Sequence, residues 1–160
     1  MERCIEGKDA EITEDRVDAQ TSRRIDNTRK RPDYILEEPL NYPLAVVEAK
    51  NGRFSISYGM QQAKEYARML DAPFAYSSNG KAFEEYDFLT GTERILPLDK
   101  FPSPEELLRR REAEANSGNG LSESEKKIQT SPYYTSYTTH SPRYYQKNAV
   151  NRVLDAVARG

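Results

Sequence analysis

The sequence predicts an α/β protein in which a small mixed β-sheet is flanked by helices and followed by a flexible linker and one C-terminal helix. Between residues 33 and 100, short apolar runs typical of buried strands surround one amphipathic helical stretch. From residue 112, Ser, Thr, Asn, Gly and Glu dominate before a final helical pattern begins. We therefore expect a core domain at residues 1–111, a linker of low order at 112–141 and a helix at 142–160.

The strands and helices of the expected core domain follow from apolar runs and breaker residues. The helix at 57–70 has apolar side chains at helical spacing and is ended by the segment Asp71-Ala72-Pro73. A second, shorter helix starts at Pro104 and ends in the basic run at Arg111. Strands are expected at residues 33–38, 44–50, 74–77 and 82–89.

Residues 1–32 are polar and show little periodicity, so we expect this segment to be irregular. Basic residues gather at its end, where they are candidates for contact with DNA phosphates. A solvated loop is the alternative interpretation, since runs of charge are often simply hydrated. These residues are Arg23, Arg24, Arg29, Lys30 and Arg31.

Composition and charge exclude several classes of function. With 24 basic and 26 acidic residues the net charge is −2, so nucleic acid would have to be bound by a local patch. Cys4 is the only cysteine and His140 the only histidine, which excludes an internal disulfide and a cysteine zinc site and argues against Ser-His-Asp catalysis. A metal would therefore be a hard cation held by carboxylates.

No segment of the sequence predicts a membrane partner or secretion. No apolar run approaches the about 20 residues of a membrane span, and the first ten residues are polar. A cytoplasmic location is the default expectation. The last helix carries Val150, Val153, Leu154 and Val157 at helical spacing, and after a linker it has no partner element of its own. We expect it to be the first element of a truncated domain.

An acidic-x-Lys triplet at the end of a strand is the feature that carries chemistry. The chain contains three such triplets, and only Glu48-Ala49-Lys50 ends an apolar strand run. Strand alternation places the side chains of Glu48 and Lys50 on one face together with Val46. Charged groups at the end of a buried strand are costly unless they are paired or used.

Asp33 is expected to lie opposite Glu48. A hairpin centred between Leu40 and Asn41 sets the two residues against each other, and directly opposed like charges destabilise a sheet. Mg²⁺ would remove this repulsion, with the Asp33 and Glu48 carboxylates, the Ala49 carbonyl and waters as ligands. Such a cation activates water, and Lys50 could orient that water or neutralise a developing oxyanion. The alternative is a surface aspartate beside a structural Glu–Lys ion pair.

Gln62 and Tyr66 are four residues apart on the expected helix and therefore share one stripe of its surface. An amide and a phenol at this place could meet the site or a DNA backbone. A tyrosine half-packed against the sheet, with no role in chemistry, is the alternative.

Three segments resemble the PD-(D/E)XK nuclease domain of type I restriction enzyme R subunits. They are Arg31-Pro32-Asp33-Tyr34, then residues 43–51 with the acidic-x-Lys triplet, then residues 58–67 with the Gln-x-x-x-Tyr element. The resemblance covers roughly residues 30–108, extends through the strands at 74–77 and 83–89, and implies a restriction-endonuclease-like fold. The family's domain usually opens with a longer N-terminal helix and strand, which residues 1–32 do not match.

The resemblance implies a Mg²⁺-dependent hydrolase, a type I site-specific deoxyribonuclease that cleaves phosphodiester bonds of unmodified DNA. Asp33, Glu48 and Ala49 would hold the metal, Lys50 would be the catalytic cation, and Gln62 and Tyr66 would help to position the scissile strand. The implied partners are double-stranded DNA and the methyltransferase and specificity subunits of a restriction-modification complex. A non-catalytic DNA-binding or subunit-assembly module with a vestigial nuclease site is the alternative.

Residues 143–150 are similar to the segment that precedes the ATP-binding loop of the family's translocase (helicase) domain, which places Gln146 near adenine. The phosphate-binding pattern Gly-x-x-x-x-Gly-Lys-Ser/Thr occurs nowhere in the chain. ATP is therefore expected as a cofactor only where the translocase domain is also present.

Overall fold

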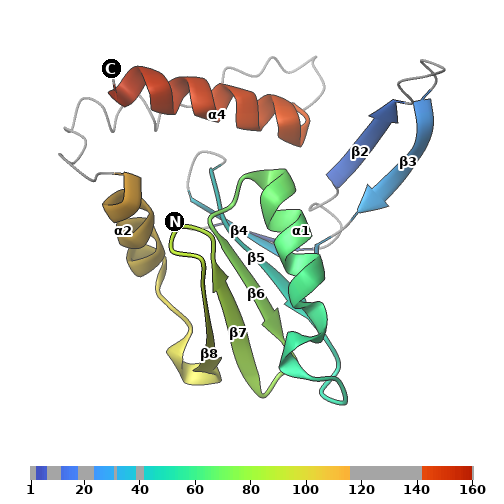
Figure 1. Cartoon of the computed structure of the whole chain (residues 1–160), viewed down its shortest axis with the longest axis vertical. Helices are drawn as coiled ribbons and strands as arrows, with labels where there is room; N and C mark the ends of the chain where they lie inside the picture. Colours follow the sequence, from blue (N-terminus) through green and yellow to red (C-terminus); the bar gives the residue numbers. More distant parts are fainter. Residues whose placement is uncertain are drawn as a thin grey trace.

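The protein is built on one mixed β-sheet, seen in the computed structural model, which describes residues 3–6, 12–17, 24–30, 32–38, 42–115 and 142–159. The sheet has six strands in the order β1-β4-β5-β6-β7-β8, and β2 and β3 form a separate two-stranded sheet (Figure 1). The strands are β1 (Arg3–Glu6), β2 (Ile12–Val17), β3 (Arg24–Lys30), β4 (Tyr34–Glu38), β5 (Tyr42–Ala49), β6 (Phe74–Ser78), β7 (Ala82–Asp87) and β8 (Thr92–Pro97).

A crossover helix joins the parallel pair β5 and β6 at the centre of the sheet. The pair runs in register with Val47 opposite Tyr76, and all other neighbours in the sheet are antiparallel. Parallel strands need a long connection, which here consists of the short 3₁₀ helix η1 (Ile56–Gly59) and the helix α1 (Met60–Leu70). The mixed sheet and its flanking helices confirm the predicted fold class.

The two faces of the sheet bury different clusters. On one face, Val46 and Ala75 pack against the apolar side of α1, including Met60 and Tyr66. On the other face, Val47 and Tyr76 lie in a cluster with Leu107 of the helix α2 (Pro104–Ala115). Consecutive residues of β5 therefore serve opposite faces, as strand alternation requires.

Most expected elements are present, with differences at the edges. The strand expected at 82–89 ends at Asp87, whose Oδ1 accepts the Leu89 N–H at 2.8 Å in a turn that contains Gly91 at φ 71°. The turn leads into β8, which the sequence did not predict. Because β8 is an edge strand whose side chains are nearly all exposed, it lacks the alternating pattern by which a half-buried strand is recognised.

The expected end of the second helix at Arg111 is wrong, because α2 continues four residues further to Ala115. The domain boundary expected at residue 111 stays a prediction. The added residues Glu112-Ala113-Glu114-Ala115 favour helix, so the charge run at Arg111 does not end it. Residues 116–141, which make up the rest of the expected linker and include His140, lie outside the described residues.

The expectation of an irregular segment at residues 1–32 is also wrong. Strand β1 pairs with β4 along the edge of the sheet, with Cys4 opposite Leu36, and β2 pairs with β3. Pairing to an existing edge imposes strand structure that local periodicity does not signal. Arg23 and Arg31 lie outside the described residues, as do the side chains of the remaining basic residues Arg24, Arg29 and Lys30, so phosphate contact by this group stays a prediction.

The last helix, α4 (Tyr144–Arg159), packs on the core domain, contrary to the expectation that it has nothing to contact. Its Asn148 Nδ2 donates to the Met69 carbonyl at 2.9 Å, and Arg152 forms an ion pair with Asp71 at 2.9 Å at the end of α1. The polar side of the helix makes these contacts, whereas Val153 is 61% exposed. Valine spacing alone therefore identified the apolar stripe and not the docked face.

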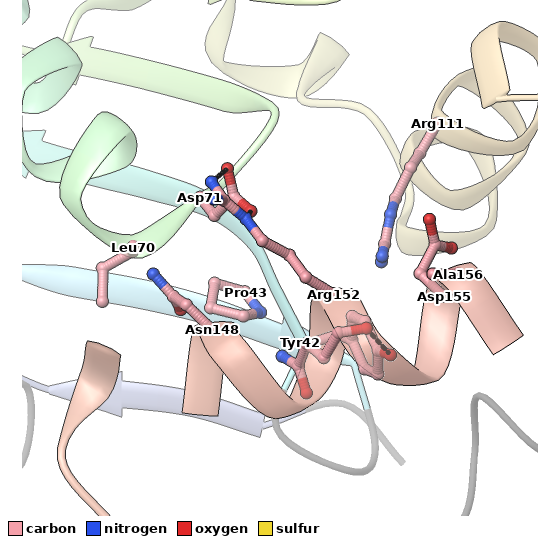
Figure 2. A pocket seen from close by; sticks show the side chains of 10 residues that line it. Tyr42, Pro43, Leu70, Asp71, Arg111, Asn148, Arg152, Asp155 and Ala156 are labelled. Carbon is pink, nitrogen blue, oxygen red and sulfur yellow. Dashed lines mark hydrogen bonds and ion pairs between the residues drawn. The ribbon is translucent and has the colours of Figure 1, made fainter. Parts of the chain in front are cut away.

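A pocket of about 380 Å³ lies under α4 (Figure 2). Tyr42 at the start of β5 lines it and donates its hydroxyl to the Asn151 carbonyl at 3.2 Å, while Arg111 approaches from α2. At the start of α4, Gln146 Oε1 accepts the Arg143 N–H at 2.9 Å, which is a capping contact. Its expected place near adenine stays a prediction. Among the described residues, no helix has the length and apolarity needed to span a membrane.

Candidate active site

Asp33 and Glu48 lie side by side where β4 begins and β5 ends. The β4–β5 register pairs Tyr34 with Val47, and continuing it by one residue sets Asp33 opposite Glu48. The Asp33 N–H donates to Glu48 Oε1 at 3.2 Å, and the Ala49 N–H donates to Asp33 Oδ2 at 2.8 Å. Each carboxylate thus accepts a main-chain N–H from the opposing strand, which offsets part of the repulsion between them.

Lys50 lies beside Glu48, just beyond the last residue of β5. Its Nζ is 2.8 Å from Glu48 Oε2, and its own N–H donates to the Ser78 carbonyl of β6 at 2.7 Å. The Glu48 side chain is 1% exposed and that of Lys50 is 20% exposed. The ammonium therefore lies between a buried carboxylate and solvent.

Gln62 and Tyr66 of α1 extend the same network. Lys50 Nζ donates to Gln62 Oε1 at 3.1 Å, and Gln62 Nε2 donates to the Tyr66 hydroxyl at 2.9 Å. Tyr66 is also buried in the cluster between α1 and the sheet. Tyr66 therefore serves both expected roles, because its ring packs in the core and its hydroxyl belongs to the hydrogen-bond network.

The electrostatics of the site leave the Glu48 carboxylate short of positive charge. Burial raises the pKa of Glu48, the Lys50 hydrogen bond opposes that rise, and the charge of Asp33 adds to it. Burial lowers the pKa of Lys50, but its hydrogen bond and charge interaction with Glu48 outweigh this and raise it. Lys50 therefore carries its proton at neutral pH.

The donor set suits a hard divalent cation. Asp33 and Glu48 supply carboxylate oxygens, and a buried carboxylate with a raised pKa gains from added positive charge. Within the described part of the chain, no group of three or more His, Cys, Asp or Glu side chains is arranged so that it could hold a metal ion. Further ligands would come from main-chain oxygens and water, and the part expected of the Ala49 carbonyl stays a prediction.

Gly59 and Ser77 also belong to the site, although the sequence did not predict them as site residues. A Cβ at Gly59 would lie 2.8 Å from Ser77 Oγ, 3.1 Å from Glu48 Cβ and 3.1 Å from Lys50 Cε. The Gly59 N–H donates to Ser77 Oγ at 3.1 Å, and Ser77 Oγ donates to the Ile56 carbonyl at 2.6 Å. A glycine directly before the helix was the available signal, because glycine permits close approach of the backbone.

Comparison with known proteins points to one family. Residues 7–102 match the family described as type I restriction enzyme R protein N terminus (HSDR_N). The chain is 38% identical over 137 residues to the type I restriction enzyme EcoAI endonuclease subunit of Escherichia coli, an alignment that covers 83% of this chain. A solved fragment structure assigned to an HsdR subunit of a type I restriction enzyme from Vibrio vulnificus YJ016 is 37% identical, covers 98% of this chain and superposes with a TM-score of 0.77.

These relatives are much longer than this chain. The chain spans 16% of the Escherichia coli subunit and 28% of the Vibrio vulnificus chain. The similarity therefore covers only part of these longer relatives.

Proposed function

Because the chain belongs to the family of type I restriction enzyme R protein N termini, we propose that it is the Mg²⁺-dependent DNA endonuclease domain of an R subunit. The proposed reaction is hydrolysis of phosphodiester bonds in unmodified double-stranded DNA. The hydrogen-bonded chain from Asp33 through Glu48, Lys50 and Gln62 to Tyr66 carries this proposal. It joins two carboxylates, a cation and a helix-borne amide at one strand end.

Each residue of the network has a separate task in the proposed reaction. Asp33 and Glu48 would hold Mg²⁺, which when bound supplies positive charge to the phosphate and acidifies a coordinated water. Lys50 keeps its proton, so its ammonium stabilises the negative charge that develops on the phosphate. The Gln62 amide is engaged at both ends, and we assign it and Tyr66 the positioning of Lys50.

The proposed partners follow from the family and not from this chain's own surface. In an R subunit of a restriction-modification complex, the methyltransferase and specificity subunits would supply the recognised sequence. ATP would act on the longer protein through a translocase domain. The 160-residue chain would contribute the strand-cutting chemistry.

Nicking of supercoiled plasmid by the 160-residue chain tests the proposal. We expect Mg²⁺-dependent nicking by the wild type and a loss of at least about 100-fold in Lys50→Ala, the scale seen when a charge-stabilising group is removed. Lys100→Ala, which removes an exposed lysine outside the network, is the matched control and should nick like the wild type. Wild-type nicking by Lys50→Ala would contradict the proposed mechanism.

The alternative, a non-catalytic DNA-binding or assembly module, predicts DNA binding without nicking. An experiment on the longer R protein, assembled with its partner subunits, distinguishes the nuclease function from this alternative. We expect Glu48→Ala to abolish cleavage there and to leave ATP hydrolysis intact. Cleavage at the wild-type rate by that variant would remove the nuclease function from this domain.

A further inference from the structure

Two aromatic side chains stack on each other at the protein surface beside the candidate active site. The rings of Phe54 and Tyr58 are 4.3 Å apart at their centroids, with an interplanar angle of 24°. Phe54 is 45% exposed and Tyr58 is 61% exposed, whereas Phe74 and Tyr76 in the core are fully buried. Aromatic surface left in water adds little to folding, and a cluster of it marks an interaction site.

The segment that carries the pair is fixed to the sheet. The Phe54 carbonyl accepts a hydrogen bond from Asn79 Nδ2 at 2.9 Å, and the Phe54 N–H donates to the Asn51 carbonyl at 2.9 Å. The Tyr58 N–H donates to the Ser55 carbonyl at 3.2 Å. The rings are thus presented by a backbone tied to the end of β6, so binding would not require the loop to order first.

Positive charge borders the pair. Arg53 directly precedes Phe54, and Lys81 approaches the same loop, since a Cβ at Gly52 would lie 3.9 Å from Lys81 Cε. Both side chains are exposed, and in the part of the chain that the structure describes neither forms an ion pair. Aromatic faces bordered by free cations are the combination by which proteins hold single-stranded nucleic acid.

The pair is also next to the reacting groups. Tyr58 directly precedes Gly59, the residue in close contact with Glu48 and Lys50. Figure 1 places the connection from β5 to α1 at the bottom of the domain, at the end opposite α4. The segment that carries the rings therefore adjoins Lys50, the residue that the proposed function assigns to the phosphate.

We propose that Phe54 and Tyr58 form a stacking platform for an unpaired base of the DNA strand that is being cut. The inference rests on the proposed function and deepens it. Because Glu48 is 1% exposed, a metal held there would be recessed, and a strand that has left the regular duplex could bring its phosphate closer to that metal. A base turned out of that strand regains on the platform part of the stacking that it lost. Stacking accepts every base, so the platform adds affinity without adding a recognition sequence.

Binding to two matched duplexes tests the platform. One duplex is fully paired and the other contains a single unpaired 2-aminopurine, and binding to the 160-residue chain is measured in EDTA so that no cleavage occurs. We expect the wild type to bind the second duplex about tenfold more tightly, as base–aromatic stacking allows. The double variant Phe54→Ala/Tyr58→Ala should lose this preference and keep its affinity for the paired duplex within about twofold.

Two further variants serve as controls for the stacking platform. Tyr145→Ala removes an aromatic ring on α4 that is 45% exposed, as Phe54 is, and should retain the preference. Phe54→Trp keeps the platform and introduces the only tryptophan of the chain, whose emission should be quenched by the unpaired-base duplex and not by the paired one.

The outcomes separate the platform from the proposed nuclease. Equal binding of both duplexes by the wild type, or a preference that survives in Phe54→Ala/Tyr58→Ala, overturns the platform and leaves a protein partner as the occupant of the rings. Lys50-dependent nicking in the presence of Mg²⁺ would still support the nuclease in that case. A base preference without any nicking would support the platform and contradict the nuclease.

Discussion

Glu48 and Glu85 are both 1% exposed, and they lie on opposite faces of the same sheet. Glu85, on the α2 face, is contacted by two guanidinium groups, with Arg94 Nε at 2.6 Å and Arg110 Nη2 at 2.9 Å. Glu48, on the α1 face, has the single ammonium of Lys50. The same residue type is thus buried with two cations in one place and one cation in the other.

The different neighbours move the two pKa values in opposite directions. Although burial raises the pKa of Glu85, hydrogen bonds from Arg110, Arg94 and Tyr76 lower it to about 2. Burial dominates at Glu48 and raises its pKa. The charge of a carboxylate held by two guanidinium groups is already balanced. A buried carboxylate with a single ammonium beside it is stabilised further by an added cation. Burial alone therefore does not mark a functional carboxylate. A buried carboxylate with too few neighbouring cations to balance its charge is the better indicator.

The largest expected effect is the loss of cleavage in Glu48→Gln without loss of stability. The substitution removes a metal ligand, so we expect nicking to fall at least about 1,000-fold. A raised folded-state pKa means that ionised Glu48 opposes folding at neutral pH, so without metal the melting temperature should stay equal or rise. Plasmid nicking and thermal melting in EDTA measure the two effects. A clear drop in melting temperature would show that Glu48 is structural.

Glu85→Ala should do the opposite. It leaves two arginines with no buried carboxylate between them, which costs about 3 kcal/mol of unfolding free energy. Denaturant unfolding measures this, and nicking per folded molecule should stay near the wild-type value because α2 lies on the face away from the site. An unchanged midpoint would mean that Asp87, which pairs with Arg110 at 2.6 Å, is the main partner.

Gly59→Ala should weaken both properties moderately. The added methyl group meets Ser77 Oγ at 2.8 Å, so the start of α1 must move away from β5, at a cost of about 1–2 kcal/mol. Because the displaced helix carries Gln62, nicking should fall while the metal ligands remain. Gly80→Ala, at a glycine with open space around it and a left-handed φ of 79°, is the control that introduces backbone strain without a close contact, whereas Gly59 itself is right-handed at φ −90°. Equal nicking by both variants would contradict the packing argument.

The pH dependence of stability should show the most gradual effect. A folded-state pKa of about 2 against an ordinary value of 4.5 means that Glu85 stabilises the fold above pH 4.5 and loses this contribution as pH falls toward 2. In Glu85→Gln that part of the acid sensitivity should disappear. Denaturant midpoints between pH 2 and 6 measure it, and identical profiles for both proteins would contradict the assigned role of the arginines.

The local order of the candidate site follows from the amino-acid sequence alone. The strand period sets Asp33 against Glu48 across the β4–β5 pair, and the helix period sets Gln62 above Tyr66. Both follow from short-range geometry, because pairing across a hairpin and spacing along a helix need no distant residue. The acidic-x-Lys triplet gained meaning from the strand that it ends.

Contacts between groups that are far apart in the sequence depend on how the elements pack in three dimensions. The hydrogen bond from Lys50 to Gln62 depends on the crossover that returns α1 over β5, and Gly59 matters only because that helix comes so close. The exposure of Phe54 was equally hidden, since an aromatic residue in a sequence is expected to be buried.

Tertiary structure also decided the edges and the docked end of the chain. Strand β8 forms because β7 offers an unpaired edge, and α4 docks through Asn148 and Arg152 because Met69 and Asp71 leave a carbonyl and a carboxylate at the end of α1. The arginines that compensate Glu85 come from β8 and α2, nine and 25 positions away. The spacing of side chains along the sequence does not predict such contacts, because they depend on how the strands and helices pack together.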